Sequence, residues 1–123
     1  MVQNFGLGTD FDTHRWENFQ LWNELVIFKM HRLIDAIVAS SPALRPNEYN
    51  QIHTQAQRAL QKFTEASYSR ATSHLDNLLR KVERANYDYE ETGENNQGEA
   101  IERAGAIKFM IEVKVAPFEA GSL

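Results

Sequence analysis

The chain has 123 residues, of which 42% are hydrophobic and 24% charged, so it is long and apolar enough for one folded domain with its own core. The formal net charge of −4 argues against a general nucleic-acid binder, which is normally basic. The absence of cysteine excludes a disulfide framework, a thiol nucleophile and a cysteine-ligated zinc site.

Residues 1–12 are predicted to form a short N-terminal tail before a helix that covers about residues 13–40. The tail lacks the basic start and apolar stretch of a secretory signal, and no apolar run in the chain is long enough to span a membrane. Within the helix, apolar residues recur at the spacing of one helical face. This stripe consists of Trp16, Phe19, Trp22, Leu25, Val26, Phe28, Met30, Leu33 and Ile37.

A connection over residues 40–46 contains two prolines and has the length usual between antiparallel helices. Because neither glycine nor proline occurs in residues 47–91, we expect a second helix over that whole range. Its apolar residues are assigned to one face, formed by Ile52, Ala56, Ala59, Phe63, Ala66, Leu75, Leu78, Val82 and Ala85.

The two predicted helices differ in length, at about 40 Å for the first and about 65 Å for the second. A hairpin of the two would leave the second helix overhanging beyond residue 75, and the overhang is still apolar. A lone two-helix hairpin also buries little surface. We therefore expect a second subunit to cover the overhang and complete a four-helix bundle, through an interface formed by Leu75, Leu78, Leu79 and Val82.

Residues 93–123 are predicted to be a flexible polar segment followed by a strand-like tail. Apolar and polar residues alternate over residues 107–115, which is typical of a strand with one apolar side. A helix over the same residues is the alternative. A single strand would pair with a copy of itself or with a partner's sheet edge. The pairing residues would be Ile107, Phe109, Ile111, Val113 and Val115.

The sequence contains few signs of catalysis. His31 and Asp35 are spaced to share a helix face, but the chain has no Glu-x-x-His pair and no His-Glu-x-x-His motif. It also lacks a Gly-x-Ser-x-Gly elbow and a glycine-rich phosphate loop. We therefore expect no metal, no cofactor and no enzymatic activity. A helical ligand carrier, with the aromatic first helix lining a pocket, is the remaining alternative of this kind.

Tyr87 and Glu91 stand out at the end of the predicted second helix. On a continuous helix they would lie on one face, one turn apart, just before a polar segment. A receptor could hold the tyrosine ring in a pocket and bind the carboxylate, provided that the last turn stays helical.

The run from Leu75 to Glu94, with this Tyr-x-x-x-acid pair inside it, resembles the small WXG-like and EspC-like helical hairpins exported by the type VII (ESX) secretion system. The Trp-x-Gly turn of that family is absent, and the tail after residue 95 is longer than usual. The resemblance implies a hairpin that dimerises into a four-helix bundle, with Tyr87 and Glu91 as part of a secretion signal. It also implies a secretion ATPase or an effector as partner, and a protein that is cytoplasmic before export and then secreted or at the cell surface.

Two hypotheses about function follow for this mainly α-helical chain. The first is a non-enzymatic, exported or export-targeting helical hairpin that acts through homo- or heterodimerisation. The second is a structural assembly subunit, such as a coat, filament or adaptor component, that oligomerises through helix packing and pairing of its C-terminal strand.

Overall fold

The structure is a computed structural model that describes residues 7–93 and 95–119, with side chains described from Trp16 to Phe118 except at residues 92 and 94. The described residues are almost entirely helical and contain no strand. The elements, in chain order, are α1 (Leu7–Ala39), η1 (Ser41–Ala43), α2 (Pro46–Thr64), α3 (Tyr68–Arg84), α4 (Tyr89–Thr92), α5 (Asn96–Met110), η2 (Ile111–Val115) and α6 (Ala116–Glu119).

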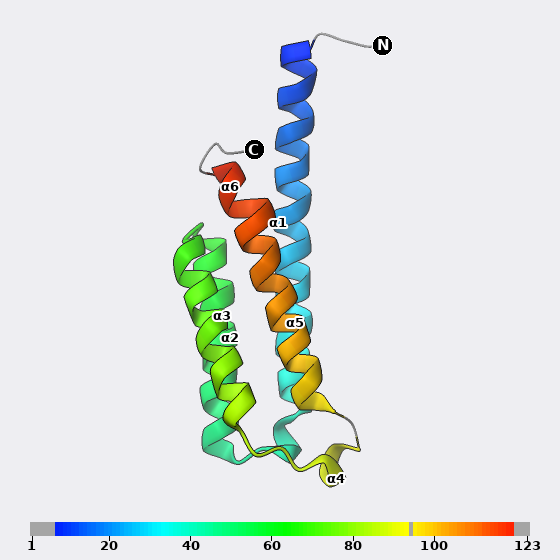
Figure 1. The fold of residues 1–123 in the computed structure, drawn as a ribbon, viewed down its shortest axis with the longest axis vertical. Coiled ribbons are helices and arrows are strands. Elements are labelled where there is room, and N and C mark those ends of the chain that lie inside the picture. Colours follow the sequence, from blue (N-terminus) through cyan, green and yellow to red (C-terminus); the bar gives the residue numbers. More distant parts are fainter. Residues whose placement is uncertain (1–6, 94, 120–123) are drawn as a thin grey trace.

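The four long helices pack in a ring. Helix α1 contacts α2 and α5, and α3 contacts the same two helices, so consecutive helices are neighbours and run in opposite directions (Figure 1). This is the arrangement of an up-and-down four-helix bundle, built here from one chain. Helix α1 is the longest, and its N-terminal part extends past the end of the α2–α3 hairpin (Figure 1).

The core lies along the axis of the bundle, and each of the four helices supplies one buried stripe at helical spacing. The stripe predicted for the first helix is buried at four of its positions, each at most 1% exposed: Val26, Met30, Leu33 and Ile37. The other stripes are Ile52, Ala56, Ala59 and Phe63 on α2, Ala71, Leu75, Leu78 and Val82 on α3, and Ala100, Ala104, Ile107, Ile111 and Val115 on α5 and η2.

The single long helix predicted over residues 47–91 is wrong, because the chain reverses between Thr64 and Tyr68. Ala66 adopts a left-handed conformation, with φ of 60°. The backbone N–H of Ser67 donates to the carbonyl of Lys62 at 2.8 Å, and that of Ala66 donates to Phe63 at 2.9 Å. These two bonds form a Schellman motif, which ends a helix by satisfying its last free carbonyl groups.

The reversal could be missed because the left-handed position usually carries glycine, and here it carries alanine. The apolar pattern does contain a signal of the break. Phe63 and Leu75 are twelve residues apart, and a straight helix would place them roughly 120° apart around its axis. One straight helix could not bury both side chains on the same face, whereas two helices joined at Ala66 do so.

Replacing Ala66 by glycine should stabilise the protein by about 1 kcal/mol. An L-residue in the left-handed region costs roughly 1–2 kcal/mol, and the greater freedom of glycine in the unfolded chain offsets part of that gain. The free energy of unfolding, measured by urea denaturation, provides the check. The matched control is Ala106→Gly at an exposed position inside α5, which should lose about 1 kcal/mol. A loss of stability in both variants would contradict the strained turn.

The strand predicted over residues 107–115 is also wrong, since Ile107–Met110 complete α5 and Ile111–Val115 form η2, a turn of π-helix. An alternating pattern has apolar residues at positions i, i+2, i+4 and so on. Every other member of this series is therefore four residues from the last, which is also the spacing of one helical face. Ile107, Ile111 and Val115 have this spacing and are at most 1% exposed. The wider π turn keeps Val115 on the core side of the helix after Ile111.

The side chains predicted to form a subunit interface at the overhang are covered by other helices of the same chain. Leu75, Leu78 and Val82 are each 0% exposed, and Leu79 is half-buried against the core. Helices α2 and α5 flank α3 and cover these side chains, so the bundle needs no second subunit to be complete.

The predicted boundaries shift at both ends of the chain. Helix α1 begins at Leu7 rather than near residue 13, so part of the predicted tail is helical, and residues 1–6 lie outside the described part. The predicted flexible segment and tail are instead α5, η2 and α6 as far as Glu119. Asn95 caps the start of α5, because its side-chain oxygen accepts from the backbone N–H of Gly98 at 2.8 Å.

Candidate functional site

The predicted recognition pair does not lie on one helix face. Helix α3 ends at Arg84 and α4 begins at Tyr89, so Tyr87 is in the linker between them and Glu91 is on α4. Tyr87 is half-buried against the core, whereas Glu91 is exposed. The backbone N–H of Asp88 donates to the carbonyl of Ala43 at 3.0 Å, which ties this linker to the loop that follows α1.

Burial raises the pKa of Tyr87 to about 12, and the neighbouring Tyr89 and Glu48 add to the rise. The ring of Tyr87 stacks with that of Tyr89 at a centroid distance of 6.5 Å. The hydroxyl of Tyr89 in turn donates to Gln97 at 2.7 Å, and Gln97 donates to the carbonyl of Val82 at 2.8 Å. The linker is therefore held on both sides, and Tyr87 stays in its neutral form at physiological pH.

This raised pKa predicts a loss of stability at high pH. The neutral phenol is favoured in the folded protein, so its contribution is complete below about pH 10 and is lost as the pH rises towards 12. Because the side chain is only partly buried, we expect an effect of about 1 kcal/mol. The stability of Tyr87→Phe should therefore fall less than that of the parent between pH 9 and pH 11, as measured by urea denaturation. Equal losses in the two proteins would contradict the burial of the hydroxyl.

The feature best suited to binding is an exposed apolar face on α1 and α5. On α1, Leu21, Leu25 and Phe28 are 63%, 36% and 59% exposed and follow one another at steps of four and three residues. On α5 and η2, Phe109 and Val113 are 60% and 40% exposed and are four residues apart. Residues at such spacing share one side of a helix. We call these five residues the outer apolar face.

The two helices that carry this face are neighbours. The Nζ of Lys114 is 5.5 Å from the centre of the Trp22 ring, and Lys29 lines the same groove as Ala106. These two pairings fix the register of α1 against α5. They place Val113 level with the segment 21–25 and Phe109 level with the segment 25–28, so the two exposed stripes lie at the same height on neighbouring helices.

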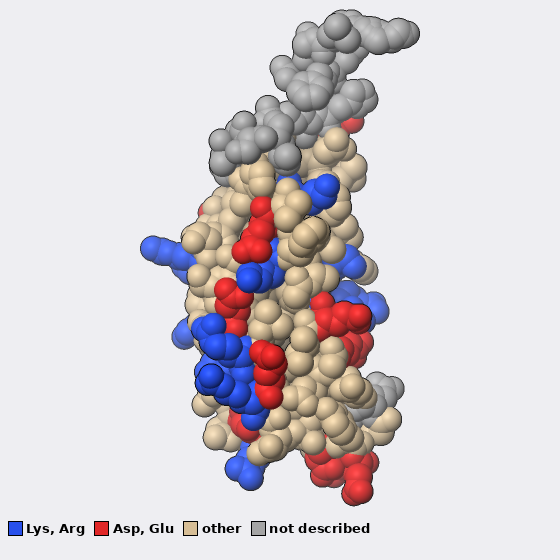
Figure 2. Space-filling view, in the orientation of Figure 1, with Lys and Arg blue, Asp and Glu red and all other residues tan. Residues whose placement is uncertain are grey.

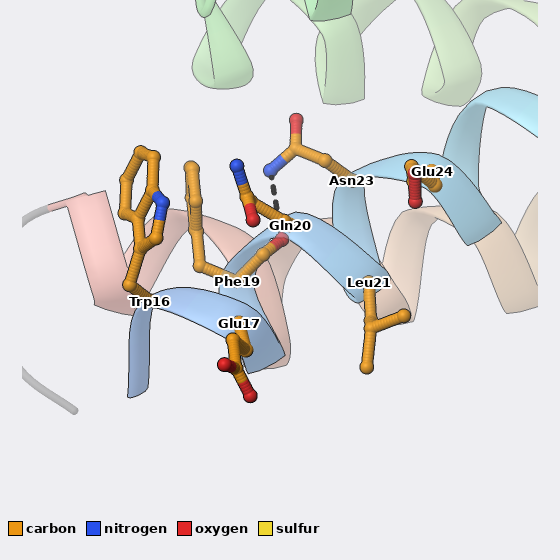
Figure 3. Close-up of a pocket in the computed structure, with 7 residues that line it drawn as sticks. All are labelled: Trp16, Glu17, Phe19, Gln20, Leu21, Asn23 and Glu24. Atoms are coloured by element: carbon orange, nitrogen blue, oxygen red, sulfur yellow. Dashed lines mark hydrogen bonds between the residues drawn. The ribbon is translucent and has the colours of Figure 1, made fainter. Parts of the chain in front are cut away.

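An aromatic cluster lies beyond the outer apolar face, near the N-terminal end of α1. The ring of Phe19 stacks on that of Phe118 at 4.4 Å and on that of Trp16 at 5.5 Å. An open groove of about 570 Å³ runs along this part of α1, and Figure 3 shows Trp16, Phe19 and Asn23 pointing to one side of the helix and Leu21 to another. The groove is too open to enclose a small ligand, which argues against the carrier hypothesis.

Charge is distributed unevenly over the rest of the surface. Lys and Arg gather over the α2–α3 side in Figure 2, and acidic residues gather at the α4 end. On the α2–α3 side, burial lowers the pKa of His74, and the nearby Arg58 and Lys62 lower it further. The His74 ring pairs with Gln55 at 2.9 Å. These contacts give His74 a structural role between α2 and α3.

Candidate metal ligands are not clustered in the described part of the chain. Nowhere in the described part do three or more histidine or acidic side chains come close enough together to hold a metal ion. His31 and Asp35 are both exposed on α1. Among the described helices, none combines the length and the apolar character that crossing a membrane requires.

The outer apolar face is not evident from the sequence alone, because apolar spacing assigns Leu25 and Phe28 to the core stripe and leaves Leu21 out. A helical wheel contains the signal. Leu21, Leu25 and Phe28 repeat at heptad spacing, but their stripe points roughly 150° away from the one through Val26 and Met30. In the same way, the alternation of residues 107–115 combines a buried stripe with an exposed pair.

Comparisons of the chain with protein families, with curated proteins and with solved structures gave no match.

Proposed function

We propose that the protein is a non-enzymatic helical module that works by docking a protein partner on its outer apolar face, as an adaptor or assembly subunit does. The observation that carries this proposal is the exposure of five large apolar side chains on two neighbouring helices. Contiguous apolar patches on soluble proteins mark interaction sites, whereas single exposed apolar residues do not.

The core of the bundle supports the same proposal. All four long helices already bury a complete apolar stripe in the core, so the outer apolar face is not needed for folding of the chain. Large apolar side chains in water reduce solubility and invite non-specific association. Their presence at this place is best explained by a partner that covers them.

The test is photo-crosslinking in the cells that make the protein. We expect a benzoylphenylalanine in place of Phe28 or Phe109 to yield a crosslinked product in which mass spectrometry identifies a protein as the second component. The same probe in place of Gln57, which is exposed on α2 on another side of the bundle, should yield no such product. Equal products from all three positions, or none from residues 28 and 109, would overturn the proposal.

A second candidate is the export function implied by the resemblance to type VII secretion substrates. It is favoured by the exposed, acidic end of the bundle, where Glu91 lies on α4 close to the Tyr87 linker. A receptor that binds both residues would have to draw the half-buried Tyr87 ring away from the core.

Secretion assays of Tyr87→Phe, Tyr87→Ala and Glu91→Gln test this candidate in a host that has the secretion machinery. If the pair is a signal, Tyr87→Ala and Glu91→Gln should leave the cell at least about tenfold less efficiently than the parent, which corresponds to a loss of roughly 1.4 kcal/mol in receptor binding. Tyr87→Phe keeps the ring and should be affected least. Parental export of all three variants, or loss only in variants that no longer fold, would rule out the signal.

A further inference from the structure

We infer that the partner on the outer apolar face is a second copy of this chain, packed with α1 of one copy antiparallel to α1 of the other about a two-fold axis. This inference rests on the proposed docking function and names its partner. It follows from the order of apolar and charged residues along α1.

We call the stripe of Leu21, Leu25, Phe28 and Arg32 along α1 the seam. Its apolar part is short, which suits an antiparallel pair. Leu21, Leu25 and Phe28 continue at heptad spacing to Arg32, whose guanidinium lies 5.9 Å from the centre of the Phe28 ring. In antiparallel packing centred between residues 25 and 28, Leu25 of each copy packs on Phe28 of the other. Leu21 then covers the aliphatic part of Arg32 in the second copy.

Charge order along the seam favours the antiparallel direction. Glu24 and Arg32 are both exposed. Glu24 lies between Leu21 and Leu25, and Arg32 follows Phe28. In this antiparallel register, Glu24 of each copy lies within about one helical turn of Arg32 of the other, twice in a symmetric dimer. Parallel packing of the two α1 helices would instead set arginine against arginine and glutamate against glutamate, which is unfavourable.

The charges also favour a second copy of the chain over an unrelated partner whose surface is strongly basic or strongly acidic. The rim of the outer apolar face carries both signs, with Glu24, Glu102 and Glu112 beside Arg32 and Lys114, all of them exposed. A strongly basic or strongly acidic partner would meet repulsion on part of this rim. A two-fold related copy presents the same mixture in the opposite order.

Charge reversal and repair give the decisive test in solution. The parent should approach twice the monomer mass of 14.2 kDa as its concentration rises in light scattering. Glu24→Arg or Arg32→Glu alone should raise the dimer dissociation constant at least about tenfold, because each change creates two like-charge contacts. The double variant Glu24→Arg/Arg32→Glu should restore the dimer. A monomeric parent at every concentration, or a double variant no better than the single ones, would overturn the inference.

Disulfide crosslinking tests the packing direction. The chain has no cysteine of its own, so only the introduced cysteines can form crosslinks. Leu25→Cys lies near the two-fold axis and should form a covalent dimer with itself. Arg32→Cys should not do so, but should crosslink to a copy that carries Leu21→Cys. Self-crosslinking of both single variants would indicate parallel helices. Crosslinking of Leu25→Cys only to a Met110→Cys copy would place α1 on α5 of the partner. Either result would overturn the antiparallel α1 pair.

These outcomes separate the inference from the proposed function. A monomeric parent that still crosslinks to a different protein in cells through residues 28 and 109 would refute self-association and leave the docking function standing. A parent that dimerises as inferred in solution but gives no product from residues 28 and 109 in cells would refute the docking function. Circular dichroism of each variant serves as the control for folding, and only variants that keep the parental helical content are compared.

Discussion

Replacing Leu75 by alanine should lower the free energy of unfolding by about 3–4 kcal/mol. The side chain is 0% exposed in the middle of the α3 stripe, and its removal loses both apolar burial and the contacts that surround the resulting cavity. A domain of this length has a total stability on the order of 6–18 kcal/mol, so the loss is a large part of it. Urea denaturation of parent and variant measures the difference.

The protein concentration in that experiment separates two explanations of the same leucine. If α2 and α5 of the same chain cover Leu75, as in the structure, the loss should be equal at low and high protein concentration. If a second subunit covered it, the loss would shrink at low concentration, where the interface is already dissociated. The control is Val38→Ala, at a side chain that is 47% exposed and outside the outer apolar face, which should cost less than about 0.5 kcal/mol. Equal costs for the two variants would contradict the core described above.

Replacing Ile111 by aspartate should abolish the cooperative fold, whereas Val113→Asp should leave it nearly intact. Ile111 is 1% exposed, and a buried unpaired carboxylate costs more than a domain of this size can readily lose. Val113 is 40% exposed on the outer apolar face, so a charge there remains in water. Helical content and the cooperativity of thermal unfolding, both followed by circular dichroism, distinguish the two variants.

This pair of variants also distinguishes a helix from a strand. In a strand, residues 111 and 113 lie on the same face and would share one environment, so the two substitutions should have similar effects. In the helix, residue 113 is two positions beyond residue 111 and points away from the core. Similar effects of Ile111→Asp and Val113→Asp would therefore contradict the helical assignment of η2.

Local sequence patterns predicted the first half of the fold well. The helix ending near Ala39, the proline-containing connection and the start of the second helix at Pro46 all follow from apolar spacing and from the restrictions that proline imposes. The predicted helical bundle is present. The composition of the bundle is different, because its four helices come from one chain rather than from two.

The reversal at Ala66 could not be predicted from local propensity. Alanine is the best helix former, and its left-handed conformation costs energy that only the packing of α2 on α3 compensates. A glycine at that position would have made the turn visible in the sequence. Once the reversal is known, the leucines assigned to a subunit interface become core residues, and Tyr87 and Glu91 fall on separate elements.

By itself, the sequence determined that the chain is helical, where its first helix ends and its second begins, and that Val26, Met30, Leu33 and Ile37 belong to an apolar stripe. These features depend on apolar spacing within one segment and on the two prolines of the connection. Only the tertiary structure decided which of two apolar stripes faces the core and which faces water. Burial depends on the neighbours that a helix acquires, and those neighbours are set by the turn at Ala66 and by the return of α5 along α1.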